Sequence, residues 1–222
     1  MALSKLTYNS LNVTPAASKG IGFDSGADDL STDFAGGDMT FIKKVTASAS
    51  ATVSFVDGTS DVVLDNTYKE YLFTFKDIHP ATDNTNLTFN LSEDTGSNYN
   101  VTKTTSAFLA FNNEADTDAG LQYSTNEDLA QSTAVQNISG LVGTDNDAST
   151  SGYLHLFNPS STTFVKHFVS RSHCYRSAVN YNYDWFIGGY GNTTSAVDAV
   201  QFSMSSGNID AGTIKLYGVK DS

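Results

Sequence analysis

Two stretches carry the strongest fold signal in this sequence: YLFTFKDI at residues 71–78 and LTFNL at residues 87–91. In the second stretch, Leu87, Phe89 and Leu91 alternate with polar residues, so all three fall on one face of an extended chain. The first stretch alternates less cleanly toward its end and is closed by His79-Pro80, because proline has no donor for a β-ladder. Both stretches predict β-strands with one apolar face.

Further strand signals recur at short intervals, separated by turn residues such as those of Asp57-Gly58. They fall at residues 40–45, 51–55, 107–111, 153–157, 163–170, 185–190, 199–204 and 213–217. Strands do not alternate with helical patterns, which disfavours a parallel α/β sheet. We therefore expect an all-β protein, an antiparallel two-sheet sandwich that is jelly-roll-like and has about ten strands.

Residues 112–150 are the least regular part of the sequence. Turn-forming residues are frequent there, and between Asp77 and Thr150 the only basic residue is Lys103. The pattern over residues 129–142 fits a strand or a short helix, and both alternatives stay open.

The first 38 residues differ from the rest because they are rich in glycine and aspartate and contain only isolated apolar residues. Such a segment is either a floppy terminus or an extended N-terminal arm that docks on a partner surface. We favour the arm, and we expect residues 39–222 to form the β-sandwich domain. The candidate anchors of the arm are Leu3, Leu6, Leu11, Ile21 and Phe23.

Composition limits the partners of this chain. It has 24 Asp and Glu against 12 Lys and Arg, a formal net charge of -12, so its surface repels nucleic-acid phosphates and anionic membranes. No apolar run is long enough for a membrane span or for the core of a signal peptide. We expect synthesis in a host cytoplasm, no membrane insertion and no nucleic-acid partner.

A catalytic nucleophile is suggested only by Ser172-His173-Cys174. Neighbouring residues in a strand point to opposite faces, so His173 cannot easily activate either neighbour there. A satisfied histidine beside a small buried thiol is the favoured interpretation. We expect no catalytic residues and no enzymatic activity.

Calcium is the only metal that the sequence suggests. Asp116 and Asp118 occupy alternate positions before Gly120, and Asp145 and Asp147 repeat this spacing. Calcium prefers several oxygen ligands on flexible loops, but the spacing of an EF-hand is absent. Solvated acidic loop tips are the favoured interpretation, and no cofactor is expected.

One aromatic stretch near the end of the chain could bind a ligand. In a strand, Tyr181, Tyr183 and Trp185 would share one face, and Arg176 precedes them. Aromatic faces beside polar and cationic tips suit a sugar platform. Core packing combined with a subunit interface, where Tyr, Trp and Arg are also frequent, is the favoured alternative.

Three segments resemble virion proteins of marine tailed phages, notably those that infect cyanobacteria. They are LSKLTYNSLNVT at residues 3–14, YKEYLFTF at residues 68–75 with the following Ile78-His79-Pro80, and SGNIDAGTIKLYG at residues 206–218. The last is similar to the pattern that closes jelly-roll domains in phage structural proteins. The resemblance implies a fibre, knob or capsid-decoration protein, and it carries over no catalytic residue.

We therefore expect a structural virion protein of a tailed phage, either a capsid-decoration or cement protein or a tail-fibre or appendage component. It would attach to other capsid or tail proteins through its N-terminal arm, display the β-sandwich and form a homo-oligomer. The alternatives are a carbohydrate-binding receptor-recognition module at a fibre tip, which would bind a host-surface glycan, and a hydrolase of surface polysaccharide.

Overall fold

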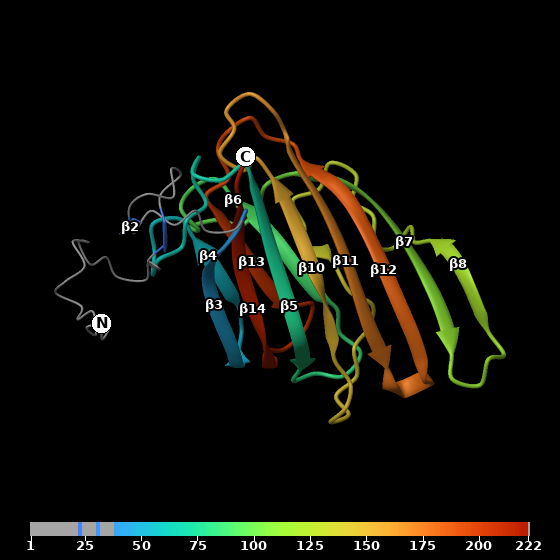
Figure 1. Ribbon diagram of the computed structural model, residues 1–222. Helices are drawn as coiled ribbons and strands as arrows, with labels where there is room; N and C mark the ends of the chain where they lie inside the picture. Colours follow the sequence, from blue (N-terminus) through green and yellow to red (C-terminus); the bar gives the residue numbers. More distant parts are fainter. Residues whose placement is uncertain (1–21, 24–29, 32–37, 222) are drawn as a thin grey trace, which may run out of the picture. The chain divides into compact units, whose positions relative to one another are not determined.

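The computed structural model describes residues 22–23, 30–31 and 38–221, and these residues form an all-β structure (Figure 1). The chain divides into two units, residues 1–37 and residues 38–222. In the first unit, β1 (Gly22–Phe23) pairs antiparallel with β2 (Leu30–Ser31), which places Phe23 opposite Leu30.

Of the five predicted arm anchors, Phe23 lies in β1. The other four lie outside the described residues; these are Leu3, Leu6, Leu11 and Ile21.

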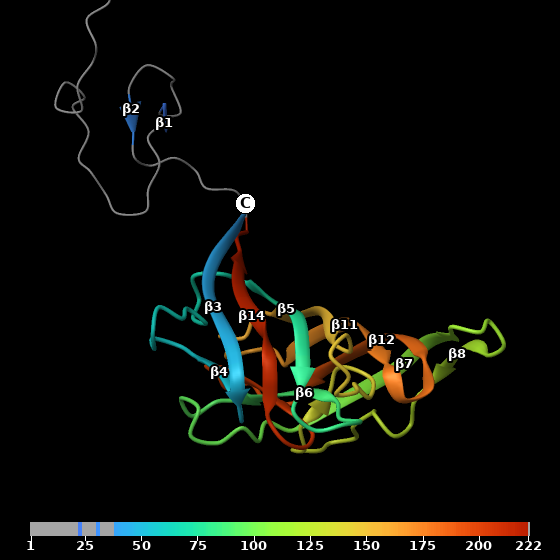
Figure 2. The same ribbon diagram turned by 90° about the horizontal axis from the view of Figure 1, so that it is seen from below.

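The second unit contains two antiparallel sheets (Figures 1 and 2). The large sheet has eight strands in the order β3 (Met39–Ser50), β14 (Ile209–Val219), β5 (Glu70–Pro80), β10 (Thr150–Phe157), β11 (Lys166–Arg176), β12 (Tyr181–Gly191), β7 (Lys103–Asn113) and β8 (Ala119–Tyr123). The small sheet has four strands in the order β4 (Val53–Val56), β13 (Ala199–Met204), β6 (Leu87–Ser92) and β9 (Gln136–Asn137).

The topology is that of a jelly roll with two insertions. Without β7, β8, β11 and β12, each sheet keeps four strands, in the orders β3-β14-β5-β10 and β4-β13-β6-β9. The chain then passes between the sheets at every step except from β6 to β9, as it does in a jelly roll of eight strands. The predicted all-β antiparallel sandwich is confirmed, and the four inserted strands extend one of its sheets beyond the other.

Most predicted strands are present, and several are longer than their sequence signals. The irregular region, residues 112–150, contains β8, which the sequence did not indicate, and β9, which lies in the stretch left open between a strand and a short helix. All five residues of β8 are exposed and β9 has only two residues, so neither carries an alternating pattern of burial. Residues 129–142 contain β9 and otherwise follow an irregular path, so neither a helix nor a long strand forms there.

Helix is almost absent from the described residues. A 3₁₀-helix at Ser177–Val179 joins β11 to β12 and ends at Asn180, which adopts the left-handed conformation at φ 56°. No helix in the described part of the chain is both long and apolar enough to cross a membrane.

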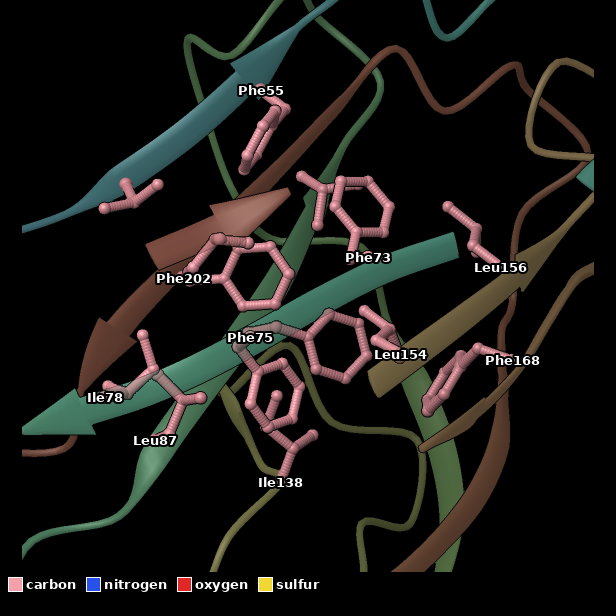
Figure 3. Close-up of a cluster of buried hydrophobic side chains, with 14 of the residues drawn as sticks. Phe55, Phe73, Phe75, Ile78, Leu87, Ile138, Leu154, Leu156, Phe168 and Phe202 are labelled. Atoms are coloured by element: carbon pink, nitrogen blue, oxygen red, sulfur yellow. The ribbon is translucent and has the colours of Figure 1, made fainter. Parts of the chain in front are cut away.

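The hydrophobic core lies between the two sheets (Figure 3). Phe55 of β4 packs edge-on against Phe73 of β5, with ring centroids 5.3 Å apart, and Phe202 of β13 lies 5.5 Å from Phe73. Phe89 of β6 packs edge-on against Phe168 of β11 at 4.9 Å. These pairs join strands of opposite sheets, and edge-to-face contacts add to the free energy gained by burying the rings.

A lysine is buried in this interior. The Lys103 side chain is fully buried, and its Nζ donates hydrogen bonds to Asn90 Oδ1 and to the Val101 carbonyl at 2.9 Å. It forms no ion pair with a described carboxylate. Burial disfavours the charged ammonium and lowers the pKa of Lys103 to about 8.

We predict that the protein becomes more stable as the pH rises from about 8 toward 10. The pKa of Lys103 falls from 10.5 in the unfolded chain to about 8 in the folded chain, so in this window the unfolded state binds more protons. The free energy of unfolding then increases with pH, by up to about 1.4 kcal/mol per pH unit. Above this window the raised pKa of buried Tyr71 acts in the opposite direction.

Urea unfolding at several pH values between 8 and 10 measures this slope. Lys103→Met should reduce it, although Lys166, whose pKa is also lowered by burial, leaves a contribution of the same sign. The exposed Lys76→Met serves as the control and should keep the wild-type slope. Equal slopes in all three proteins would contradict the prediction.

Candidate functional site

A groove lies on the face of the extended sheet that points toward the core. It consists of two adjoining depressions with volumes of about 310 Å³ and about 200 Å³. The larger one is at the lower end of the range for ligand pockets, roughly 300–1,000 Å³. Both depressions are lined by Leu109, Gln122, Arg176 and Tyr183.

Strand register brings the predicted aromatic residues into this groove. Tyr181 lies opposite Arg176, and Tyr183 opposite Cys174, in the antiparallel pair of β11 and β12. Tyr181 and Tyr183 line the first depression, and Trp185 lines the second together with Tyr183. The three aromatic residues therefore share one face, with Arg176 nearby, and their role as a sugar platform stays a prediction.

The aromatic residues differ in accessibility. Tyr181 and Tyr183 are partly exposed and stack with ring centroids 5.6 Å apart and an interplanar angle of 14°. Trp185 is only 8% exposed, so most of its ring is covered by the protein. The ring that could contact a ligand most broadly is thus a tyrosine, whereas Trp185 forms part of the groove's base.

The indole of Trp185 is held against a glycine. A Cβ atom on Gly140 would collide with Trp185 Nε1 and would lie 2.9 Å from Cys174 Sγ, so only glycine fits there. Trp185 Nε1 is buried and has no acceptor among the described residues. Trp185 and Gly140 both line the second depression, but the Nε1 atom itself is covered by the protein and packed against Gly140.

Arg176 is positioned by a chain of amide contacts. Its Nε donates to Asn84 Oδ1 at 3.2 Å, and Asn84 Nδ2 donates to Asp83 Oδ2 at 2.7 Å. Within the described part of the chain, Arg176 forms no ion pair. The guanidinium is therefore oriented through Nε, and its two terminal nitrogens have no carboxylate partner.

Two carboxyl groups also line the groove. Asp118 Oδ2 accepts a hydrogen bond from the Tyr181 hydroxyl at 2.6 Å, and this bond raises the pKa of Tyr181. Burial raises the pKa of Glu127, against the opposing effect of a hydrogen bond from Asn137 Nδ2. Both carboxyl groups thus have neutral hydrogen-bond donors as partners.

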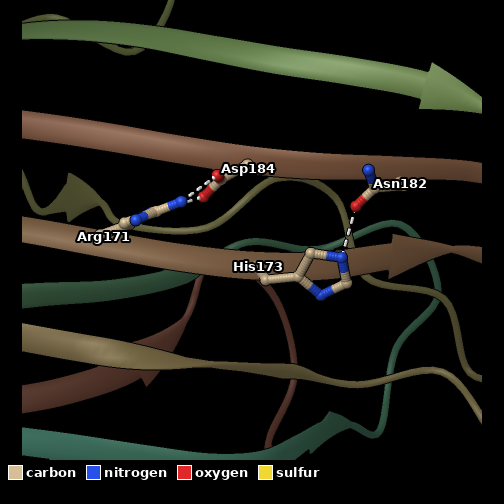
Figure 4. A network of polar contacts seen from close by, with 4 residues as sticks. All are labelled: Arg171, His173, Asn182 and Asp184. Atoms are coloured by element: carbon tan, nitrogen blue, oxygen red, sulfur yellow. Dashed lines mark hydrogen bonds and ion pairs between the residues drawn. The ribbon is translucent and has the colours of Figure 1, made fainter.

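The Ser172-His173-Cys174 motif is divided between two faces of β11, as the strand alternation predicts. His173 is exposed and contacts Asn182 Oδ1 (Figure 4). Cys174, in contrast, is fully buried, and burial raises its pKa to about 12. Ser172 Oγ donates to the Ile138 carbonyl at 2.6 Å. The three side chains therefore do not form a nucleophile with its base.

The calcium candidates lie in two loops. Asp116 and Asp118 belong to the β7–β8 hairpin, and Asp145 and Asp147 precede β10. No group of three or more His, Cys, Asp or Glu side chains in the described ranges is arranged to hold a metal ion. Solvated acidic loop tips without bound calcium stay the prediction for these four residues.

Several groove residues had no signal in the sequence. They come from segments without periodicity and reach the groove only when the chain folds over β12 and β7. These residues are Asn86, Gln122, Asn126, Glu127 and Gly140. Residue type alone gave no reason to group them.

Comparisons with protein-family models, with curated proteins and with solved structures found no match. The chemistry of the groove therefore follows from its own residues. It offers aromatic faces, amide side chains, two carboxyl groups and one guanidinium, which together suit a ligand with both apolar ring faces and polar edges.

We predict that Gly140→Ala displaces Trp185 and destabilises the protein by about 1–3 kcal/mol, because the new methyl group would overlap the indole. Trp185 is the only tryptophan, so a shift in the intrinsic fluorescence maximum reports the displacement directly. Gly188→Ala is the matched control, because a Cβ on Gly188 meets nothing within 4 Å. Identical emission spectra for both variants would be incompatible with this packing.

Proposed function

We propose that this chain is a structural protein of a tailed-phage particle. It would be a capsid-decoration or cement protein, or a component of a tail fibre or appendage, without enzymatic activity. Residues 1–38 would attach it to capsid or tail proteins, and the β-sandwich would be displayed on the particle.

The observation that carries this proposal is the organisation of the chain. Residues 1–37 form a unit separate from residues 38–222, and the second unit contains a jelly roll. The sequence resemblance to marine phage virion proteins runs through both parts. A β-sandwich unit that follows a separate N-terminal unit in the sequence suits a protein that attaches through its N-terminal segment and displays its sandwich.

We also propose that the protein is a homo-oligomer. Large apolar side chains are exposed on the outer face of the large sheet, which we define as the face pointing away from the small sheet. They belong to strands β7, β8, β10 and β11 and are Phe108, Leu121, Tyr123, Tyr153 and Val169. An exposed apolar patch of this kind favours association with another protein surface.

Removal of residues 1–38 tests the structural proposal. We expect the shortened chain to stay folded, with an unchanged circular dichroism spectrum, and to fail to join particles when it is supplied in an infection by a phage lacking its own copy. The full chain is the control. Light scattering of both proteins measures their oligomeric mass. Incorporation of the shortened chain at the wild-type level would refute attachment through this segment.

A second candidate function is carbohydrate binding, and the groove favours it. We propose that the groove binds a host-surface glycan, as a receptor-recognition module at a fibre tip would. Tyr181 and Tyr183 present aromatic rings, while Gln122 and Arg176 provide polar groups near them. Sugar rings have apolar C–H faces and hydroxyl edges, and this groove offers partners for both.

We predict that glycan binding changes the fluorescence of Trp185, which lines the groove. Tyr181→Ala and Tyr183→Ala should each weaken affinity by roughly threefold to tenfold, because each removes an aromatic contact. Tyr153→Ala is the matched control, since Tyr153 is exposed on the outer face. A glycan array gives the ligands for titration. Equal losses in all three variants, or no binding to any glycan, would refute the assignment of the groove.

A further inference from the structure

We propose that the groove selects an acidic carbohydrate, and that Arg176 binds the carboxylate or sulfate group of one of its sugar units. This inference rests on the proposed carbohydrate-binding function and adds the chemical class of the ligand. It follows from the unusual position of a single cation among the groove residues.

The chain has two arginines, and they differ in whether a carboxylate of the protein pairs with them. Arg171 points to the outer face, where its Nε and Nη2 donate to Asp184 at 3.0 Å and 2.7 Å (Figure 4). It also lies 4.8 Å above the ring of Phe186. Arg171 is therefore paired with a carboxylate of the protein itself, in the bidentate geometry that arginine makes with such a group.

Arg176 lies five residues later on the same strand and lacks such a partner. Its lining position in both depressions places the guanidinium along the groove, and its Nε is fixed by Asn84. A guanidinium offers a planar fork of donors that matches an oxyanion. In Arg176 this fork is oriented by the protein and left without an acidic partner from the described residues.

The two carboxyl groups of the groove do not pair with the Arg176 guanidinium. Asp118 is bonded to the Tyr181 hydroxyl, and Glu127 is bonded to Asn137. Arg176 is also the only cationic side chain among the described residues that line the two depressions. The Arg176 guanidinium is thus the one oriented cation that the groove presents to an anionic ligand group.

The indole of Trp185 borders the same site. Trp185 is only 8% exposed, and its Nε1 atom is covered by the protein, so the part of the side chain that faces the depression is its ring. Trp185 and Arg176 line the same depression, so one ligand could contact both.

The spacing of the aromatic residues indicates a ligand of several units. Tyr181 and Trp185 are four residues apart on β12, which corresponds to about 13 Å of strand and to roughly two or three sugar rings. The net charge of -12 opposes the approach of polyanions. Short acidic oligosaccharides at physiological ionic strength, where the Debye length is about 8 Å, reduce that repulsion and are the suitable probes.

The test is a glycan array that contains neutral, carboxylated and sulfated oligosaccharides, probed with the wild-type full chain and with two variants. We expect the wild type to retain acidic glycans. Arg176→Gln should lose about tenfold or more in affinity for them, as expected for the removal of hydrogen bonds from a charged group. Arg171→Gln, the matched control on the opposite face, should bind like the wild type.

Chemical modification of the best ligand identifies the group that Arg176 binds. Methyl esterification removes the charge of sugar carboxylates, and desulfation removes sulfate, so loss of binding after one treatment distinguishes the two sources. Arg176→Gln should no longer respond to that treatment. Arg176→Lys, which keeps the charge without the planar fork, should recover part of the affinity, and circular dichroism checks that the variants are folded.

The outcomes separate this inference from the function on which it rests. Binding of neutral glycans only, or equal binding of acidic glycans by the wild type and Arg176→Gln, would overturn the inference and leave carbohydrate binding intact. If the array shows no ligand at all, carbohydrate binding and the inference both fail.

Discussion

The pairing of β12 with β11 and β7 is the constraint on which the groove depends. Each pairing runs over eleven residues, so the alternation of side chains along β12 is locked on both sides. This register places Ile187 and Trp185 toward the core and continues the same face outward to Tyr183 and Tyr181. A slip of one residue would exchange this face for Asn182, Asp184 and Phe186, and it would remove the aromatic groove and the core contacts together.

The extension of one sheet explains why a groove exists beside the core. The four strands of the small sheet cover the jelly-roll part of the large sheet, and β7, β8, β11 and β12 reach beyond them. The edge strand β9 of the small sheet and the residue after it cover part of this extension, through hydrogen bonds from Thr105 to Gln136 and from Ser172 to the Ile138 carbonyl. Because a loop packs less continuously than a sheet, depressions lined by Tyr183 and Glu127 stay accessible.

The charge distribution connects the groove to function. The protein is strongly acidic, yet its two arginines lie on opposite faces of β11, one within an ion pair and the other at the groove. Asn84, itself hydrogen-bonded to Asp83, accepts a hydrogen bond from Arg176 Nε and so orients the guanidinium of Arg176. In the proposed role on a virion, this groove would attach to a surface glycan while the acidic surface limits non-specific contacts.

The sequence by itself determined the sandwich class, because the alternation in segments such as residues 87–91 is a local property of the chain. It also determined that Tyr181, Tyr183 and Trp185 share a face, since the period of a strand is fixed at two residues. It could not determine β8, β9 or the contributions of Glu127, Gly140 and Asn84, which come from irregular segments. The tertiary structure alone decided that these segments meet Arg176 at the groove and that Trp185 is largely buried, because both facts depend on contacts between residues far apart in the sequence.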